Sequence, residues 1–188
     1  MKQLIPLTAA LLLLCLSPAA PHGTAAQRRE HLTPEEIEHV RDNQELDKRT
    51  GVFVRAAERR VLMLTDPAAA ARAAEKEKET WGELKGTRSQ LLYDVGRILE
   101  EAVVNIDDVH QRDPASSLLR KSLYKLSEAA ARFVPQLTPL REQVSDEAER
   151  DQLERAIETA QEILEAAKSH AVTEADGKAK DKGGKKGN

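Results

Sequence analysis

The sequence predicts an all-α protein, an antiparallel bundle of four long helices plus one short Ala-rich helix. Aromatic residues make up only 3% of the 188 residues, which is too few for the strands of a β-sandwich or barrel. Apolar residues recur at spacings of three and four without a run of strict alternation, a period typical of amphipathic helices. Helix-capping residues separate the apolar stripes. Helices joined by such short connections are expected to pack as antiparallel neighbours.

The first long helix has the clearest beginning. Thr33 is placed as its N-cap, Pro34 stands at the first helical position, and Glu36 completes a capping box. An apolar stripe follows until the pair Asp66-Pro67, which predicts the end of this helix and the cap of the next. We therefore expect one helix over residues 34–65.

The short helix is expected over residues 67–81, where alanines give high helix propensity and Trp81 is the one large anchor. A second capping box, from Thr87 to Gln90, predicts the start of the second long helix. Its apolar stripe extends from Leu91 to Val109.

The two remaining long helices are delimited by prolines and caps. Asp113-Pro114 repeats the Asp-Pro pattern and predicts the start of the third long helix. Pro135 and Pro139 are expected to kink or end it, because proline lacks the N–H that a helix interior needs. Ser145 is the predicted cap of the fourth long helix.

The N-terminal 26 residues predict an export signal. Lys2 is followed by an apolar run over residues 4–16 and by a stretch of small residues, the three parts of a secretory signal peptide. The run is too short to span a bilayer as a helix, so no stable membrane anchor is expected after cleavage near Gln27. The mature chain would then lack cysteine, which suits a periplasmic or extracellular location.

The rest of the chain divides into a helical-bundle domain, residues 27–170, and a Lys/Gly-rich tail, residues 171–188. The tail contains five lysines and three acidic residues but almost nothing apolar, and such a composition predicts disorder. The domain contains 23 basic and 29 acidic residues. An acidic body argues against a nucleic-acid partner, for which a basic face is expected.

Motifs for catalysis and cofactors are missing from the sequence. It contains no Gly-x-Ser-x-Gly elbow, no Gly-rich phosphate loop after a strand, and no Cys-x-x-Cys-His. Glu36-x-x-His39 and Asp107-x-x-His110 resemble the acid-x-x-His pairs of di-iron bundles, but the other helices offer no matching carboxylates. We therefore expect no enzyme activity, no cofactor and no tightly bound metal.

A partner surface is predicted from a second apolar strip on the first long helix. Val52, Ala56 and Met63 lie roughly a quarter-turn from the main stripe, and the second long helix has a fainter strip at Tyr93 and Val104. One interpretation places this helix between two neighbours in the core. The other keeps the strip for a protein partner or a second copy, a use that suits the adaptable side chain of methionine.

Two segments, Leu32-Thr33-Pro34-Glu35-Glu36 and Leu137-Thr138-Pro139-Leu140-Arg141, resemble the Leu-Thr-x-x-Gln segments of small periplasmic helical chaperones and metal-stress sensors of the Spy and CpxP type. Both lack the Gln, and the likeness covers only about ten residues. It implies a protein that holds partly unfolded clients in the cell envelope. We favour an exported, non-catalytic interaction or scaffold module, with this chaperone function second and a metal-binding bundle third.

Overall fold

The computed structural model describes residues 30–178, which form helices and contain no strand. In chain order the helices are α1 (Pro34–Asp42), α2 (Leu46–Thr65), α3 (Pro67–Trp81), α4 (Arg88–Arg112), α5 (Ser117–Leu137), the 3₁₀ helix η1 (Thr138–Gln143), α6 (Glu147–Ser169) and α7 (Glu174–Gly177). The predicted all-α class is confirmed, and α2, α4, α5 and α6 are the long helices. The predicted signal peptide, residues 1–26, lies outside the described residues.

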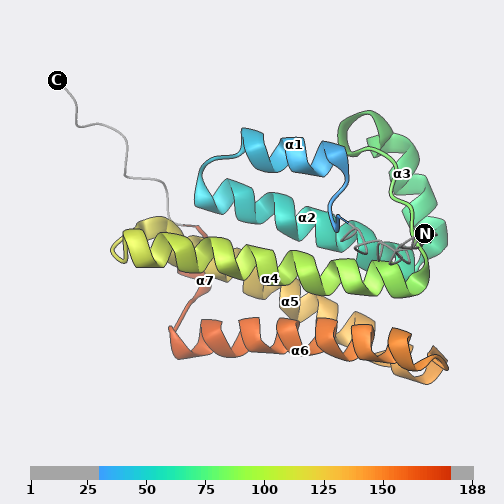
Figure 1. Cartoon of the computed structure of the whole chain (residues 1–188). Helices are drawn as coiled ribbons and strands as arrows, with labels where there is room; N and C mark the ends of the chain where they lie inside the picture. Colours follow the sequence, from blue (N-terminus) through green and yellow to red (C-terminus); the bar gives the residue numbers. More distant parts are fainter. Residues whose placement is uncertain (1–29, 179–188) are drawn as a thin grey trace, which may run out of the picture.

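The four long helices form a bundle in which α2 and α6 each pack against both α4 and α5 (Figure 1). Consecutive long helices run in opposite directions, whereas α4 and α5 lie on a diagonal of the bundle and make few contacts. The neighbouring pairs α2/α5 and α4/α6 therefore run in the same direction. As a result, the C-terminal ends of α4 and α6 lie at the same end of the bundle, beside the first turn of α5.

The helix expected over residues 34–65 is two helices, which corrects the prediction. α1 ends at Asp42, and its C-cap Asn43 donates its side-chain amide to the carbonyl of His39 over 2.8 Å. Arg49 Nε then donates to the Asn43 carbonyl over 3.1 Å. These polar bonds compete with helical hydrogen bonding, so the chain reverses and α1 lies alongside α2 (Figure 1).

Three predicted N-caps are confirmed and two are wrong. Thr33 and Thr87 form complete capping boxes, and Asp66 accepts from the amide of Ala69. Asp113, however, ends α4, and a turn separates it from α5, which begins at Ser117. Asp146, rather than Ser145, caps α6 by accepting from the Glu149 amide.

Pro135 neither ends α5 nor starts a new helix. α5 continues to Leu137, and the chain then tightens into the 3₁₀ helix η1, in which Pro139 stands near the beginning. A proline is tolerated there because the first turn of a helix needs no N–H donor.

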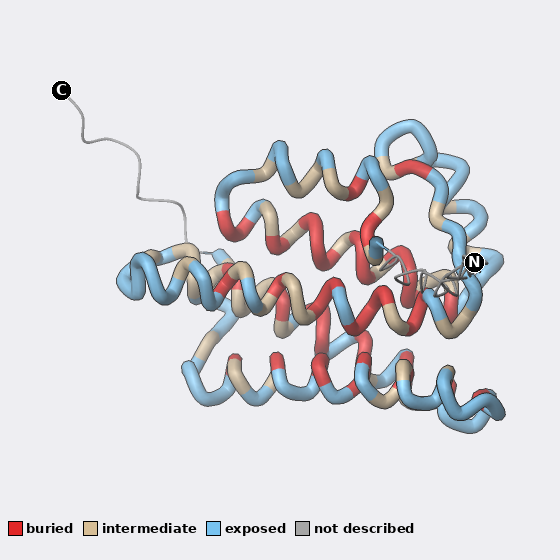
Figure 2. The backbone as a smooth tube through the Cα atoms, viewed as in Figure 1, coloured by how far each residue is buried: buried red, intermediate tan, exposed pale blue. Residues whose placement is uncertain are grey.

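The core lies between the four long helices, where the buried residues face one another (Figure 2). Leu92, Ile98 and Leu99 of α4, Leu126 of α5 and Leu153 of α6 are completely buried. Ile98, Leu99, Leu126 and Leu153 belong to the predicted apolar stripes, whereas Leu92 lies beside the stripe of its helix.

The folded part extends beyond the predicted boundary at His170. Arg120 of α5 donates to both carboxylate oxygens of Asp176 in α7, over 2.8 and 3.0 Å, and to the backbone carbonyls of His170 and Ala171. The hydrogen bonds from Arg120 hold the pKa of the Asp176 carboxyl well below its ordinary range. Residues 171–178 thus pack on α5 through polar contacts, whereas composition predicts order only from apolar burial.

Candidate functional site

A groove of about 870 Å³ lies at one end of the bundle. It opens where α4 and α6 end and α5 begins, and we call it the α4/α6 groove. Its lining residues are Glu100, Val103, Val104, Ile106, Asp107, His110, Pro114, Ala115, Ser116, Ser117, Leu119, Arg120, Leu123, Thr159, Glu162, Ile163, Ala166, His170 and Val172.

The local sequence explains why this end stays open. α4 and α6 run in parallel and end side by side, while the turn after Asp113 carries the chain to the start of α5. Several of the lining residues are small: Ala115, Ser116 and Ser117 around the start of α5, and Ala166 on α6. Small side chains leave the space between the backbones unfilled, so the apolar stripes behind them remain accessible.

The wall of the groove is apolar and partly exposed. Val104 of α4 is 56% exposed and is the only exposed large hydrophobic residue among residues 30–178. Val103, Leu119 and Leu123 line the same groove and are half-buried, and Ile163 in the lining is buried. Apolar side chains that line an open groove are typical of binding sites.

The rim of the groove is acidic. Asp107 of α4 and Glu162 of α6 are exposed, and neither makes an ion pair or side-chain hydrogen bond with another residue in the range 30–178. Glu100, seven residues before Asp107, pairs with Arg97. Arg120, the one arginine in the lining, donates hydrogen bonds to the carboxylate of Asp176, and these bonds raise the pKa of the guanidinium. The rim therefore presents two carboxylates without a counter-charge from the described residues.

A second hollow, of about 360 Å³, lies between α2, α3 and the end of α5. The Ala-rich helix α3 covers it and has no buried residue of its own. Met63 lines this hollow, where Arg55 forms ion pairs with Glu58 and Glu77. These charged side chains are already paired with one another. The second hollow is therefore a weaker candidate for a binding site than the α4/α6 groove.

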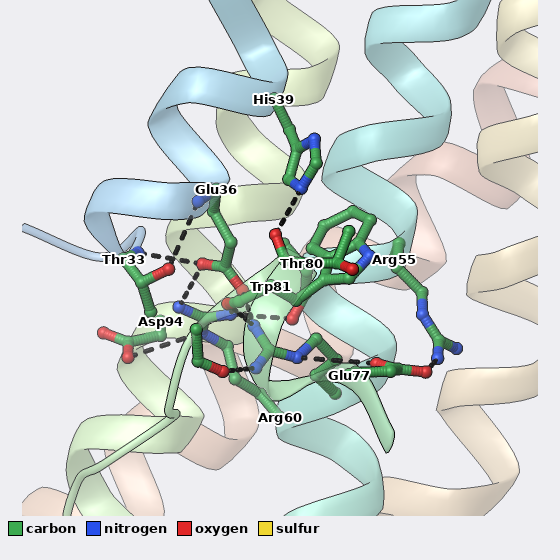
Figure 3. A network of polar contacts seen from close by, with 12 residues as sticks. Thr33, Glu36, His39, Arg55, Arg60, Glu77, Thr80, Trp81 and Asp94 are labelled. Carbon is green, nitrogen blue, oxygen red and sulfur yellow. Dashed lines mark hydrogen bonds and ion pairs between the residues drawn. The ribbon is translucent and has the colours of Figure 1, made fainter. Parts of the chain in front are cut away.

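A network of buried charges holds α1 to the bundle at the opposite end of α4 (Figure 3). Glu36 is 0% exposed and Arg60 is 1% exposed. The Glu36 carboxylate accepts from Arg60 through two bonds of 2.9 Å and from Arg59 over 2.6 Å. Asp94 of α4 lies 3.5 Å from Arg60 Nε. Burial of these charges is compensated within the network, which fixes α1 against α2 and α4.

The same network fixes the end of α3. Arg59 donates to the carbonyls of Trp81 and Gly82 over 2.9 and 2.7 Å, and its guanidinium lies 5.9 Å from the centre of the Trp81 ring. His39 bonds to the carbonyl of Thr80 over 2.7 Å and stacks on Trp81 with 4.5 Å between ring centres. Every member has a structural partner, so the network explains how the helices are held together rather than what the protein binds.

The structure separates the five residues of the predicted partner surface. Val52 and Ala56 are 7% and 0% exposed, because α2 lies between neighbouring helices on several sides, so these two cannot form a surface strip. Met63 lines the second hollow, and Tyr93 is half-buried outside both hollows. Only Val104 belongs to the α4/α6 groove.

The two acid-x-x-His pairs lie in different parts of the fold and make different contacts. Glu36 and His39 are bound by Arg60 and Thr80, as described above. Asp107 and His110 both line the α4/α6 groove. Within residues 30–178, no three His, Cys, Asp or Glu side chains stand close enough to hold a metal ion.

Sequence reasoning missed Arg59, Arg60 and Asp94. Arginine and aspartate are usually exposed, and Glu36 already had an explanation as a capping residue. A signal was present, however. Arg60 stands four residues after Ala56 and four before Leu64, in the middle of the apolar side of its helix, and a cation at such a position implies a buried carboxylate opposite.

None of the helices among residues 30–178 combines the length and apolar character that a membrane span requires. Comparison of the chain with protein-family models, with curated proteins and with solved structures finds no match. The geometry of the chain itself is therefore the basis for any assignment of function.

Proposed function

We propose that the protein is an exported, non-catalytic interaction module that binds a segment of a partner protein in the α4/α6 groove. The observation that supports this most directly is the exposure of Val104 above an apolar wall in a groove of about 870 Å³. A hollow of this size lies within the range of known binding sites, which combine apolar walls with a few polar groups.

Burial by a partner would be favourable at this wall. Covering a fully exposed valine or leucine contributes about 1.5–3 kcal/mol. Val104 is exposed by about half, and Val103 and Leu119 by less. Together these three side chains contribute about 1–3 kcal/mol by the same measure, so a partner must add contacts of its own to offset the cost of association.

The rim favours binding over catalysis. Asp107, His110, Glu162 and His170 are all exposed. Acid–base catalysis generally uses groups whose pKa is shifted by burial or by close charged neighbours. Side chains that stand in water on opposite sides of a groove are better placed to orient a bound chain.

Export rests on the sequence of residues 1–26, with its basic start, short apolar run and small residues. Protein recovered from outside the cytoplasm should begin near Gln27. Recovery of intact Met1 in N-terminal sequencing would refute the export part of the proposal.

A photoreactive residue introduced at Val104 tests the groove directly in the producing cells. We expect one discrete crosslinked product, absent when the photoreactive residue replaces Asp108, which is exposed on the same helix outside the groove. With purified components, Val104→Lys should abolish the complex and leave the melting temperature unchanged. Asp108→Lys should leave both the complex and the melting temperature unchanged. A product unaffected by Val104→Lys would contradict the proposal.

The same crosslinking experiment separates the chaperone alternative, in which many clients bind. A client-holding protein would give a broad distribution of crosslinked masses and would suppress the aggregation of an unrelated unfolding protein. A single product without such suppression supports the interaction module.

A further inference from the structure

We infer that the occupant of the α4/α6 groove is a basic amphipathic α-helix of another protein, whose cations pair with Asp107 on α4 and Glu162 on α6. This inference rests on the proposed function and adds the chemistry of the partner. It follows from the shape of the groove, from its charges, and from what the rest of this chain can offer.

The shape favours a helix over an extended chain. Along α4 the groove extends from Glu100 to His110, which is about 15 Å at 1.5 Å per residue. A helix of about ten residues covers that length with anchors at positions i, i+3 or i+4, and i+7. An extended segment would leave backbone N–H and C=O groups against an apolar wall, and the described residues contain no strand to pair with them.

The charges favour a basic partner. Asp107 and Glu162 project from the two helices that flank the apolar wall, and neither has an ion-pair partner within residues 30–178. Glu100 lies on the same face of α4 as Asp107, because seven residues make about two helical turns. The guanidinium of Arg120 is already bound by Asp176. A helix with an apolar stripe between lysines or arginines matches this arrangement on both sides.

From residue 30 onwards the chain offers no comparable occupant. Residues 179–188 contain four lysines but only one apolar residue, Ala179. Their charge complements the acidic rim of the groove, but they have too few apolar side chains to cover its apolar wall. A second copy would need an exposed apolar helix face, and Val104 is the only exposed large hydrophobic residue from 30 to 178. A partner of different sequence therefore fits best.

The experiment uses the purified protein and two stapled helical peptides that share one leucine stripe and differ only in having lysines or glutamates beside it. Fluorescence anisotropy should show the lysine peptide binding about tenfold more tightly, the effect expected of a few partly exposed ion pairs. The difference should shrink in 1 M salt, where the screening length falls to about 3 Å.

Charge reversal supplies the decisive comparison. Asp107→Lys with Glu162→Lys should reverse the preference, so that the glutamate peptide binds more tightly. Asp108→Lys with Glu158→Lys makes the same change of net charge on the same two helices, at exposed positions outside the groove. This control pair should leave the preference for lysine intact. If both pairs change it equally, the attraction is a property of the whole acidic protein and the inference is overturned.

Other outcomes of these experiments also test the inference of a basic helical partner. Equal binding of both peptides, lost in Val104→Lys, would keep the groove as a binding site and overturn its charge preference. If neither peptide binds, the helical occupant is refuted, while crosslinking at position 104 still decides whether the groove binds another partner. A tenfold gain in lysine-peptide affinity on deletion of residues 179–188 would identify the chain's own C-terminus as the occupant. A dimer in sedimentation that Val104→Lys dissociates would identify a second copy. Either result would overturn the inference.

Discussion

Neutralising Glu36 should destabilise the protein more than any comparable change of a surface charge. Its carboxylate is completely buried and accepts four hydrogen bonds, two from Arg60, one from Arg59 and one from the amide of Thr33. Glu36→Gln keeps the shape and one acceptor oxygen but replaces the other oxygen with a donor. The two guanidinium groups then lose the charge that compensates their burial.

The magnitude follows from the burial. Removing one partner of a buried ion pair costs about 3–5 kcal/mol, because an uncompensated charge remains inside. For a chain of this size each kcal/mol lowers the melting temperature by about 2–4 °C, so we expect a fall of about 6–20 °C. The matched control is Glu38→Gln on the same helix. Glu38 pairs with Arg41 in solvent, where an ion pair contributes about 0–1 kcal/mol.

Urea unfolding followed by circular dichroism measures both variants. Glu36→Gln should move the midpoint strongly without changing the slope, since the surface exposed on unfolding stays the same. Adding Arg60→Met should cost less in the Glu36→Gln background than in the wild type, because the two residues share one interaction. Equal effects of Glu36→Gln and Glu38→Gln, or additive effects of the double variant, would refute the assignment of this network as a buried charge-compensated unit.

Four further substitutions test the backbone, the core and the pH dependence. Gly82 has φ +65° and ψ −179°, a conformation nearly confined to glycine, so Gly82→Ala should cost about 1–3 kcal/mol in thermal or urea unfolding. Gly51→Ala, inside α2 with only an ordinary contact to Lys125, should instead stabilise by about 0.5–1 kcal/mol. Leu99→Ala should cost about 2–5 kcal/mol, because Leu99 is completely buried, and a smaller loss would contradict its place in the core. Burial raises the pKa of the Asp47 carboxyl, but Lys121, at 2.7 Å, and Lys125 together lower it below the ordinary 3.8. The cost of Asp47→Asn to the unfolding free energy should therefore be full above pH 3.8 and shrink as the pH falls further; a cost that stays constant in acid would argue against this ion pair.

Local signals in the sequence predict local features well. The capping boxes at Thr33 and Thr87 and the Asp66-Pro67 junction involve residues within one helical turn of each other, so they are readable without knowledge of the fold. The break after Asp42 was missed because it depends on Asn43 competing with the helix and on Arg49 of the next helix. Asp113 was misassigned because the same Asp-Pro pair can end one helix without starting another.

The candidate site was only partly readable from the sequence. Val104 stands out because an apolar residue off the main stripe of α4 is unusual, whereas the groove arises from how α4, α5 and α6 meet. Val52 and Ala56 give the same sequence signal as Val104 and are buried, because α2 is central and α4 borders the open end. Periodicity identifies a second apolar face but does not say whether a helix of the same chain covers it.

The diagonal placement of α4 and α5 has a consequence for how the chain folds. These two helices are joined by the short turn after Asp113, so their contact would be quick to form, yet they touch little in the folded protein. The extensive contacts of α2 with α5 and of α4 with α6 close long loops, whose entropy must be lost before the contacts form. Higher contact order slows folding, so this bundle should fold more slowly than one in which every pair of consecutive long helices packs together. An isolated α4–α5 hairpin should not be stable, and the order of assembly should be set by the arrival of α2 and α6.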